Sequence, residues 1–570
     1  MRLGLGLTLP FLPWAAAGSA LAAGPALSLP FSTMSTGADL LAKGVTFSRP
    51  GLATQYDSTG KLTWAPNNLL LWSNDFTNAA WTKSTVTVAA GIADPDGGTN
   101  AFTVTATAGG AFIYQRPSTS GNHIASVWAR VRTKTGLIEL RTPANTSVPL
   151  EPTSSWQRLS TLSANVASPF LIVFLANSGD QVDLYEAQLE AVTYQTTPRP
   201  YVATTSAAYY GPRFDFDPVT LAAKGLLIEE SRTNVVLNSA DHSTASWTKF
   251  NSPVTANAAI APDGTLTASK MIEAATTGQH AVFNASGFPN TAATAYTAST
   301  YLKAGERTWA LFAIEINGTS YGKYVNLTTG AIGGVAGNAP DGFTVENDGN
   351  GWWRISATKT SVGTASGFCS VYMASADGVA SYSGDGTSGI YRWGSQYETG
   401  SFATSLIFTQ NASVTRAADS ASITGPAFSS IWNPLEGTIV IEGEIVKGGA
   451  YSFSVDDNTA NNRMLVYHTG TGLDMVANSG GPLIVNNTLG AYNLAAHPNF
   501  KAAFTYKVND YAGSLNGAAA VVGTPSGAVP PVTQMRIGGG GTGTESNGHV
   551  KSFSYYRTRF PNAQLVTLTT

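Results

Sequence analysis

An internal duplication is the feature that most constrains the fold of this chain. A block of motifs that begins at Asn68 returns from Asn234, roughly one domain length later. Four stations recur in the same order, namely an Asn-aliphatic-aliphatic-Leu opening followed by a serine, a Trp-Thr-Lys triplet followed by Pro-Asp-Gly, a Trp/Arg-aliphatic-Ser strand and a closing Gln-x-Glu. The stations are Asn68–Leu71 with Ser73, Trp81–Lys83 with Pro95–Gly97, Trp156–Ser160 and Gln188–Glu190, and then Asn234–Leu237 with Ser239, Trp247–Lys249 with Pro262–Gly264, Trp353–Ser356 and Gln396–Glu398. Two copies of so long a block predict two domains of one fold.

The repeated block is typical of β-structure. β-Branched residues alternate with others in Thr85–Val88 and Phe102–Val104, and Phe170–Phe174 is a short apolar run. Only 12% of the residues are charged, and glycine, serine, threonine and asparagine are abundant, which suits exposed strands joined by tight turns. We therefore expect an all-β protein without long helices.

Changes along the chain predict the domain boundaries. Several prolines punctuate the region between the copies, which favours a semi-rigid connector, and the residues after the second copy match neither repeat. The expected units are an N-terminal apolar segment with an extended docking arm (1–67), a first module (68–205), a connector (206–233), a second module (234–416) and a C-terminal β-sandwich (417–570).

The second copy is the longer one. The offset between copies is 166 residues from Trp81 to Trp247 but 208 residues from Gln188 to Gln396. Insertions gather in surface loops, which often carry function on a rigid scaffold. The segment 305–351 is therefore the first place in which to look for a site.

The N-terminus leaves two interpretations open. Met1-Arg2 precedes an apolar run from Leu3 to Ala17, and Ala20-Leu21-Ala22 has the form of a leader-peptidase site. Prolines and glycines within the run favour an assembly or docking peptide instead. Export and assembly thus remain alternatives.

Composition bounds the partners and the redox chemistry. A net charge of −3 with no basic stripe makes nucleic acid and anionic membrane poor partners, and no later segment has the length of apolar sequence that spans a bilayer. Cys369 is the one cysteine, which excludes an internal disulfide and a cysteine-based zinc site. We expect it to be a small buried residue in a strand.

Candidate catalytic groups are few. The six histidines form no i,i+2 or i,i+4 pair, and no Gly-x-Ser-x-Gly elbow is present. Glu442 and Glu444 are expected to share a strand face, as glycosidase carboxylates do, although a solvated strand face explains them more simply. No cofactor is expected except structural calcium, for which the candidate ligands are Asp456–Asn458 and, near the module ends, Asp183, Asp241 and Glu398.

Aromatic rings beside amide and carboxylate groups are the best candidate ligand-binding groups. A sugar packs its C–H face on a ring, and its hydroxyls seek planar polar partners. The candidates in the enlarged copy are Trp309, Tyr321, Tyr324, Trp352 and Tyr382, and those in the C-terminal unit are Asn458, Asn461, Arg463 and Tyr467. The alternative for each of them is an ordinary packing role.

Taken together, the motifs resemble those of bacteriophage tail-fibre and head-spike proteins. The resemblance rests on the Asn-Leu-Leu-x-x-Ser opening, Trp-Thr-Lys, Gln-x-Glu and the connector Gly225–Asn234. It implies that the two modules are carbohydrate-binding-module-like jelly rolls. The C-terminal unit resembles a concanavalin A-like or laminin G-like domain, through Gly513–Gly517 and Gly548–Lys551.

The resemblance also implies a function. It predicts a receptor-binding protein of the virion, often homotrimeric, whose partners are other virion proteins and a host cell-surface polysaccharide or glycoconjugate. It supplies no catalytic residue, so an enzyme is not expected. Two alternatives stay open, namely a polysaccharide depolymerase that uses the C-terminal carboxylates and an exported, prophage-encoded cell-surface lectin.

Overall fold

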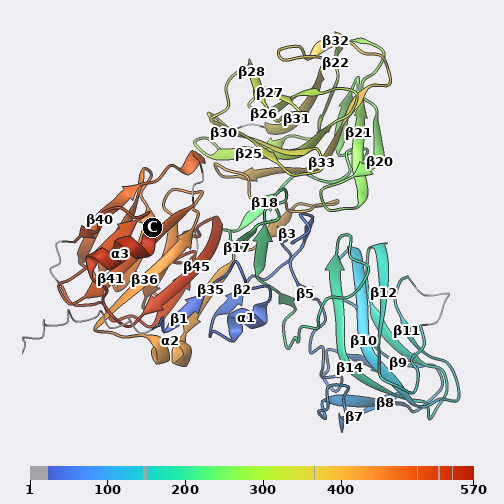
Figure 1. Cartoon of the computed structure of the whole chain (residues 1–570). Helices are drawn as coiled ribbons and strands as arrows, with labels where there is room; N and C mark the ends of the chain where they lie inside the picture. Colours follow the sequence, from blue (N-terminus) through green and yellow to red (C-terminus); the bar gives the residue numbers. More distant parts are fainter. Residues whose placement is uncertain (1–23, 145–149, 365, 497–498, 524–526, 542) are drawn as a thin grey trace, which may run out of the picture.

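The computed structural model describes residues 24–144, 150–364, 366–496, 499–523, 527–541 and 543–570. The apolar segment 1–23, for which the sequence predicts an export signal or a docking peptide, lies outside these residues. Three strand-rich bodies surround a central junction (Figure 1), which confirms the all-β expectation. The described helices are short, namely α1 (Gly37–Leu41), α2 (Gly425–Ile431) and α3 (Asn562–Thr569). None of these described helices combines the length and the apolar character that crossing a bilayer requires.

The first module is a jelly roll built from two facing antiparallel sheets. From β8 to β14, successive strands alternate between the two sheets, which is the jelly-roll pattern of connections. The larger sheet has the order β12 (Gln157–Val166), β10 (Gly121–Thr133), β14 (Gln181–Val192), β8 (Ala101–Ala106), β7 (Val86–Ile92). The smaller sheet has the order β11 (Ile138–Arg141), β13 (Leu171–Leu175), β9 (Ala111–Gln115), β6 (Thr82–Ser84).

The second module repeats this plan. The sheet that corresponds to the larger sheet of the first module has the order β20 (Val254–Ile260), β21 (Leu266–Ile272), β33 (Gly389–Thr399), β25 (Ala295–Ala304), β30 (Trp352–Thr360), β29 (Gly342–Asn347). The facing sheet has the order β19 (Trp247–Phe250), β23 (Ala281–Asn284), β31 (Ser366–Ala374), β26 (Trp309–Ile316), β27 (Thr319–Asn326), β28 (Ile332–Gly337), and β24 (Phe288–Pro289) also pairs with β31. Among the described residues between β11 and β12 of the first module, the strands β27, β28 and β29 have no counterpart. The extra length of the second copy therefore widens both of its sheets.

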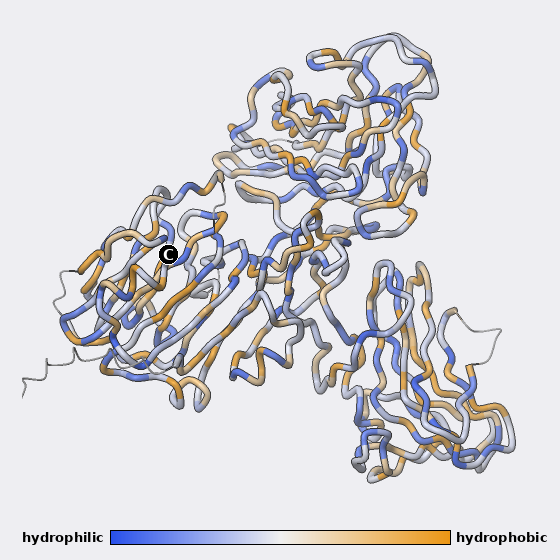
Figure 2. The backbone as a smooth tube through the Cα atoms, in the orientation of Figure 1, coloured by the Kyte–Doolittle hydropathy of each residue, from blue (hydrophilic) through white to orange (hydrophobic). Residues whose placement is uncertain are grey.

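Alternation along the strands creates the two cores. Figure 2 shows hydrophobic and hydrophilic residues following one another along the strands of each sandwich. In β30, for example, Ile355 and Ala357 are buried in the module core, while Ser356 and Thr358 lie on the opposite face of the sheet. The buried Cys369 of β31 belongs to the same core.

The repeated motifs form a clasp that fastens the ends of each jelly roll. Asn68 and Asn234 are fully buried, and each accepts hydrogen bonds from two backbone N–H groups and donates to two carbonyls. Their partners lie two residues downstream, in the last strand and in the segment that follows it, namely Leu70, Leu189, Ala187 and Val202 for Asn68, and Val236, Tyr397, Ser395 and Ile407 for Asn234. The closing Gln-x-Glu holds that same segment, because Gln188 accepts from the Val202 N–H at 2.9 Å and Gln396 from the Ile407 N–H at 2.8 Å.

The tryptophans of the Trp-Thr-Lys motif complete the clasp. Trp81 and Trp247 are 1% and 2% exposed, as expected for core anchors. Each indole N–H donates to the carbonyl of a residue with left-handed backbone, Trp72 (φ 46°) and Asn238 (φ 50°) respectively. The duplication is thus preserved in side-chain hydrogen bonds as well as in strand order.

The C-terminal body is a sandwich of two antiparallel sheets that share one large core. One sheet has the order β16 (Arg213–Phe216), β17 (Ala223–Ile228), β45 (Gly548–Tyr556), β36 (Glu436–Gly443), β41 (Phe500–Lys507), β42 (Ala512–Leu515), β43 (Val521–Val522). The other has the order β2 (Thr46–Ser48), β35 (Ser420–Thr424), β44 (Gln534–Ile537), β37 (Tyr451–Asp456), β38 (Arg463–His468), β39 (Gly472–Asn478), β40 (Leu483–Ala491). Leu565 of α3 packs on Val440 and Ala503, on the outer side of the first sheet.

The N-terminal arm and the connector supply strands to this C-terminal sandwich, which therefore includes residues outside the expected range 417–570. β1 (Leu27–Leu29) and β17 both pair with β45, and β2 pairs with β35. In Figure 1 the blue strands β1 and β2 lie against the orange and red C-terminal body. The arm is captured because Leu27 and Leu29 are buried in the C-terminal core.

The rest of the arm lies at the centre of the molecule. β3 (Thr54–Tyr56) and β4 (Leu62–Trp64) form a hairpin. Leu62 packs in a cluster with Tyr301 and Trp393 of the second module, and Thr63 accepts a hydrogen bond from Gln195, just beyond the last strand of the first module. β5 (Asn67–Asn68) then pairs with β15 (Tyr209–Tyr210) of the connector. One short segment therefore contacts both jelly rolls and the connector.

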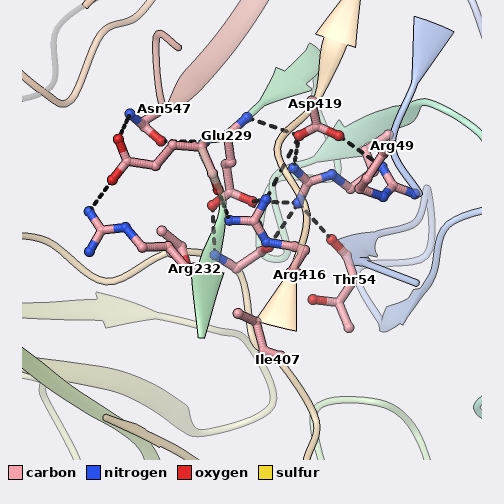
Figure 3. Close-up of polar contacts among 12 residues, drawn as sticks. Arg49, Thr54, Glu229, Arg232, Ile407, Arg416, Asp419 and Asn547 are labelled. Carbon is pink, nitrogen blue, oxygen red and sulfur yellow. Dashed lines mark hydrogen bonds and ion pairs between the residues drawn. The ribbon is translucent and has the colours of Figure 1, made fainter. Parts of the chain in front are cut away.

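A group of buried, charged side chains lies at the junction (Figure 3). Asp419 bonds to Arg49 of the arm and Arg213 of the connector, and Glu229 pairs with Arg213 and with Arg416 at 3.4 Å. Burial alone would raise the pKa of Glu229, but Arg416 and Arg213 hold that pKa well below its usual range. Arg416 belongs to β34 (Val414–Arg416), a strand that pairs with β18 (Arg232–Asn234). The end of the second module therefore reaches the same group of charges.

Candidate binding cleft between the second jelly roll and the C-terminal sandwich

A cleft of about 810 Å³ lies beside this junction. One wall is formed by β29, β30 and the segment 401–406 of the second module, and the other by the connector, the residues after β36 and the start of β45. The arm strand β3 also lines the cleft. The cleft therefore exists only because the arm, the connector and two of the three bodies meet here.

The second-module wall is polar and carries the aromatic ring of Phe402. Thr344, Ser356 and Thr358 line it, and the hydroxyls of Thr344 and Ser356 lie 2.7 Å apart. The half-buried Phe402 also lines the cleft, whereas the ring of Phe343 packs against the module core. This wall is the face of β29 and β30 that points away from the module core, so strand alternation leaves hydroxyls there.

Asp348, at the turn after β29, is buried in the cleft wall. Its Oδ1 accepts a hydrogen bond from the hydroxyl of Tyr56, which itself lies 3.1 Å from the hydroxyl of Tyr301. Asp348 is 5% exposed, and burial raises its pKa to about 8, even though Tyr56 and the nearby Arg354 oppose the shift. Within the described part of the chain, Oδ2 of Asp348 has no hydrogen-bond partner. Asp348 is therefore mostly protonated at neutral pH.

The opposite wall carries a histidine between two carboxylates. His549 Nε2 lies 2.7 Å from Asp215 Oδ2, and Nδ1 bonds to Glu444. Burial and Lys224 act to lower the pKa of His549, but the two carboxylates outweigh them and raise it. Asp215 also accepts the Tyr56 N–H at 2.6 Å. Tyr56 thus bridges the two walls, because its backbone bonds to Asp215 and its hydroxyl to Asp348.

The five aromatic residues of the enlarged copy that the sequence suggests as ligand-binding groups do not lie together in the structure. None of these five residues lines the cleft. Trp352 is 1% exposed and its indole donates to the Ile260 carbonyl, and Tyr324 is 7% exposed. Neither ring can offer a face to a sugar, which corrects that expectation, because strand alternation turns both into packed positions. Trp309 and Tyr321 are half-buried, and Tyr382 is half-buried below Arg307 with its hydroxyl donating to Glu273.

The suggested residues of the C-terminal unit do come together, on the outer face of β37 and β38. Arg463 donates to the hydroxyl of Tyr451, whose ring lies 5.9 Å from that of Tyr467. Asn458 accepts from Arg536 at the edge of this face, and Asn461 is exposed in the adjoining loop. The face is an open polar and aromatic surface, separate from the cleft.

The carboxylates suggested for catalysis do not form a pair. A register shift between Glu442 and Gly443 breaks the alternation of β36, so Glu442 and Glu444 do not share a face as the sequence predicted. Glu444 lines the cleft, whereas Glu442 lies in a smaller hollow near Thr570.

Protein donors engage the acidic groups considered for calcium. Asp183 pairs with Arg130 and Arg132, Asp241 accepts from Ser243, and Glu398 accepts from Thr404. In the Asp456–Asn458 segment, Asp457 accepts from Thr459. Among the described residues, no group of three or more histidine, cysteine or acidic side chains is arranged to hold a metal ion.

Reasoning from the sequence missed most of the cleft. Tyr56, Asp215, Asp348 and His549 come from four distant segments, and no local motif connects them. Two signals did point here, since the segment 305–351 contains the lining residues 342–348, and Glu444 was singled out for its charge.

Comparison with known proteins yields no family for this chain. No family model and no curated protein matches it. Among solved structures, the tandem CBM22 domains of Paenibacillus barcinonensis Xyn10C are 11% identical, with 58% of this chain and 98% of that chain covered and a TM-score of 0.18. Domains LG4-5 of the mouse laminin alpha1 chain are 8% identical (57% and 96% covered, TM-score 0.19), and Trypanosoma rangeli sialidase in complex with the inhibitor DANA is 9% identical (92% and 94% covered, TM-score 0.22). TM-scores this low support no conclusion about function.

Proposed function

We propose that this protein is a virion structural protein, of the tail-fibre or head-spike kind, that binds a host cell-surface glycan in the cleft. The cleft itself is the observation that carries the proposal. Its volume of about 810 Å³ lies within the range of roughly 300–1,000 Å³ that is usual for ligand sites. Hydroxyls, carboxyls and an arginine beside the Phe402 ring suit a sugar, which needs planar polar partners and an apolar surface at once.

The virion setting is supported by the motifs of the sequence. The opening, the connector Gly225–Asn234 and the Gln-x-Glu closing resemble those of phage tail-fibre and head-spike proteins. A homotrimer would present several clefts together, and such multivalency raises the avidity of weak single sites.

Glycan arrays and calorimetry with the full chain test the proposal. The variants Glu346→Gln and Thr344→Ala change exposed residues of the cleft wall, and Phe402→Ala removes a ring. We expect each to weaken glycan binding about tenfold, which corresponds to about 1.4 kcal/mol. Glu151→Gln, an exposed change in the first module, is the matched control and should bind like the unaltered protein. Unchanged affinity in all three cleft variants would refute the proposed site.

A polysaccharide depolymerase is the second candidate, and one observation favours it. Asp348 has a pKa raised to about 8 in the same cleft as the Glu444 carboxyl, and carboxyls in contrasting environments are typical of glycoside hydrolases. Against it, both oxygens of Asp348 are withdrawn from the cleft, since one accepts from Tyr56 and the other is buried. New reducing ends released from host capsule, and lost in Glu444→Gln, would favour the enzyme over the adhesin.

A further inference from the structure

A lysine, an asparagine and a glutamate meet at the edge of the cleft. Lys447 lies in the loop after β36, Asn547 directly precedes β45, and Glu230 follows β17. Lys447 Nζ lies 2.5 Å from Glu230 Oε2, and Asn547 Nδ2 lies 3.3 Å from the same oxygen. Because both contacts end on one atom, the amine and the amide lie within a few ångströms of each other.

The amide of Asn547 is held in one orientation. Its Oδ1 accepts the backbone N–H of Glu230 at 2.8 Å, and its Nδ2 also donates to the Glu545 carbonyl at 2.9 Å. A donor on the carbonyl oxygen polarises the amide and stabilises the negative charge that develops there during nucleophilic attack. Asn547 is 5% exposed, so little water competes for its carbonyl carbon.

The carboxylate of Glu230 is also fixed in place. Arg232 lies 2.5 Å from its Oε1, which leaves Oε2 for Lys447 and Asn547. Figure 3 shows Arg232 and Asn547 bonded to opposite oxygens of one carboxylate. The side chain of Glu230 is 13% exposed and that of Lys447 is 29% exposed. The lysine is thus the most exposed member of the group, and its flexible stem lets the amine approach the amide.

We propose that Lys447 and Asn547 join in an isopeptide bond, with Glu230 as the group that moves the proton. The Lys447 ammonium gives a proton to Glu230 Oε2, and the free amine attacks Cγ of Asn547. The Glu230 N–H stabilises the oxyanion at Oδ1. The bond from Cγ to Nδ2 then breaks, Nδ2 takes up a proton from Glu230, and nitrogen leaves as ammonium once the second Nζ proton is released. Nothing is oxidised or reduced, and the products are one secondary amide and one ammonium ion.

The bond would fasten the C-terminal sandwich beside the cleft, independently of the proposed glycan binding. It would close a covalent loop from residue 447 to residue 547, and cross-links across long loops restrict the unfolded chain most. Asn547 lines the cleft, so the bond would also fix part of its wall.

Mass spectrometry of the purified full chain, digested after prolonged incubation, tests this inference. We expect a linked peptide that contains residues 447 and 547 and weighs about 17 Da less than its two components, because one ammonia is lost. Finding only the two separate peptides would overturn the proposal.

Three variants make the test specific. Lys447→Arg keeps the charge beside Glu230 but cannot form the amide, so the linked peptide should vanish while the circular dichroism stays unchanged. Glu230→Gln keeps the amine and the amide, so persistence of the link there would overturn the role of Glu230. Lys507→Arg alters a lysine of the same domain that pairs with Glu436, and it should leave the linked peptide in place.

Discussion

Arg49 and Asp419 lie 2.9 Å apart although 370 residues separate them along the chain. Both side chains are at most 1% exposed. The other oxygen of Asp419 bonds to Arg213, so one carboxylate joins the arm, the connector and the start of the C-terminal sandwich. Three of the four parts of the chain that build the cleft thus meet at one buried charge.

Replacing Asp419 by asparagine should strongly destabilise the protein. The change leaves Arg49 and Arg213 buried without a full counter-charge, and breaking a buried pair in this way costs about 3–5 kcal/mol. In calorimetry, the C-terminal sandwich of the variant should unfold at a lower temperature than that of the unaltered protein. Glu151→Gln, which breaks an exposed pair with Lys134, serves as the control and should cost no more than about 1 kcal/mol. Similar transitions for both variants would contradict a structural role for the buried charges.

The two clasp asparagines should matter equally, each to its own module. Asn68→Ala and Asn234→Ala each leave buried backbone N–H and C=O groups without a hydrogen-bond partner. We expect each change to lower the free energy of unfolding of its jelly roll by about 3 kcal/mol. Limited proteolysis followed by mass spectrometry would show which module opens first. Asn461→Ala, at an exposed position, should leave the cleavage pattern unchanged. Cleavage confined to the same module in both clasp variants would contradict the duplication of this role.

Asp348 should make the protein less stable as the pH rises. Burial raises its pKa in the folded protein to about 8, so between about pH 4 and pH 8 the unfolded chain has lost a proton that the folded chain retains, and stability falls across this window. Asp348→Asn removes the ionisable group and should be more stable than the unaltered protein at about pH 8. Urea unfolding at several pH values measures the effect, and equal pH slopes for both proteins would count against it.

His549 should stabilise the protein most at acidic pH. Its pKa is raised in the folded state, so its contribution is complete below the pKa of an exposed histidine and is lost as the pH rises through the folded value. His549→Gln should therefore cost several-fold more stability at about pH 5.5 than at about pH 9, as followed by thermal unfolding. Asp348→Asn retains the histidine and should keep this part of the pH dependence. A constant difference at every pH would show that His549 acts through packing alone.

The sequence predicts the β-sandwich plan well because the duplication is local and repetitive. Asn68 and Asn234, Trp81 and Trp247, and the Gln-x-Glu pairs each bind backbone close to the ends of one module, so their repetition reports directly on the shared fold. The arm is harder to predict. Its strands are two or three residues long, and the partners of Leu27 and Thr46 lie hundreds of residues away, in β45 and β35.

The candidate site is predicted less well for a related reason. Tyr56, Asp215, Asp348 and His549 meet only after four segments have packed together, so no spacing in the sequence records their proximity. Burial also separates residues that look alike in the sequence. Trp352 is sealed in a core cluster while Phe402, at the margin, lines the cleft.

The sharing of β45 between β1 and β17 limits how the molecule can be divided. A fragment that started at residue 418 would lack β1, β2, β16 and β17, and the long edges of β45 and β35 would then have free N–H and C=O groups. Open edges of this kind recruit strands from other molecules and promote aggregation. Recombinant versions of the C-terminal sandwich should therefore carry the early strands as well, for example by fusing residues 24–50 and 212–230 to it through short linkers.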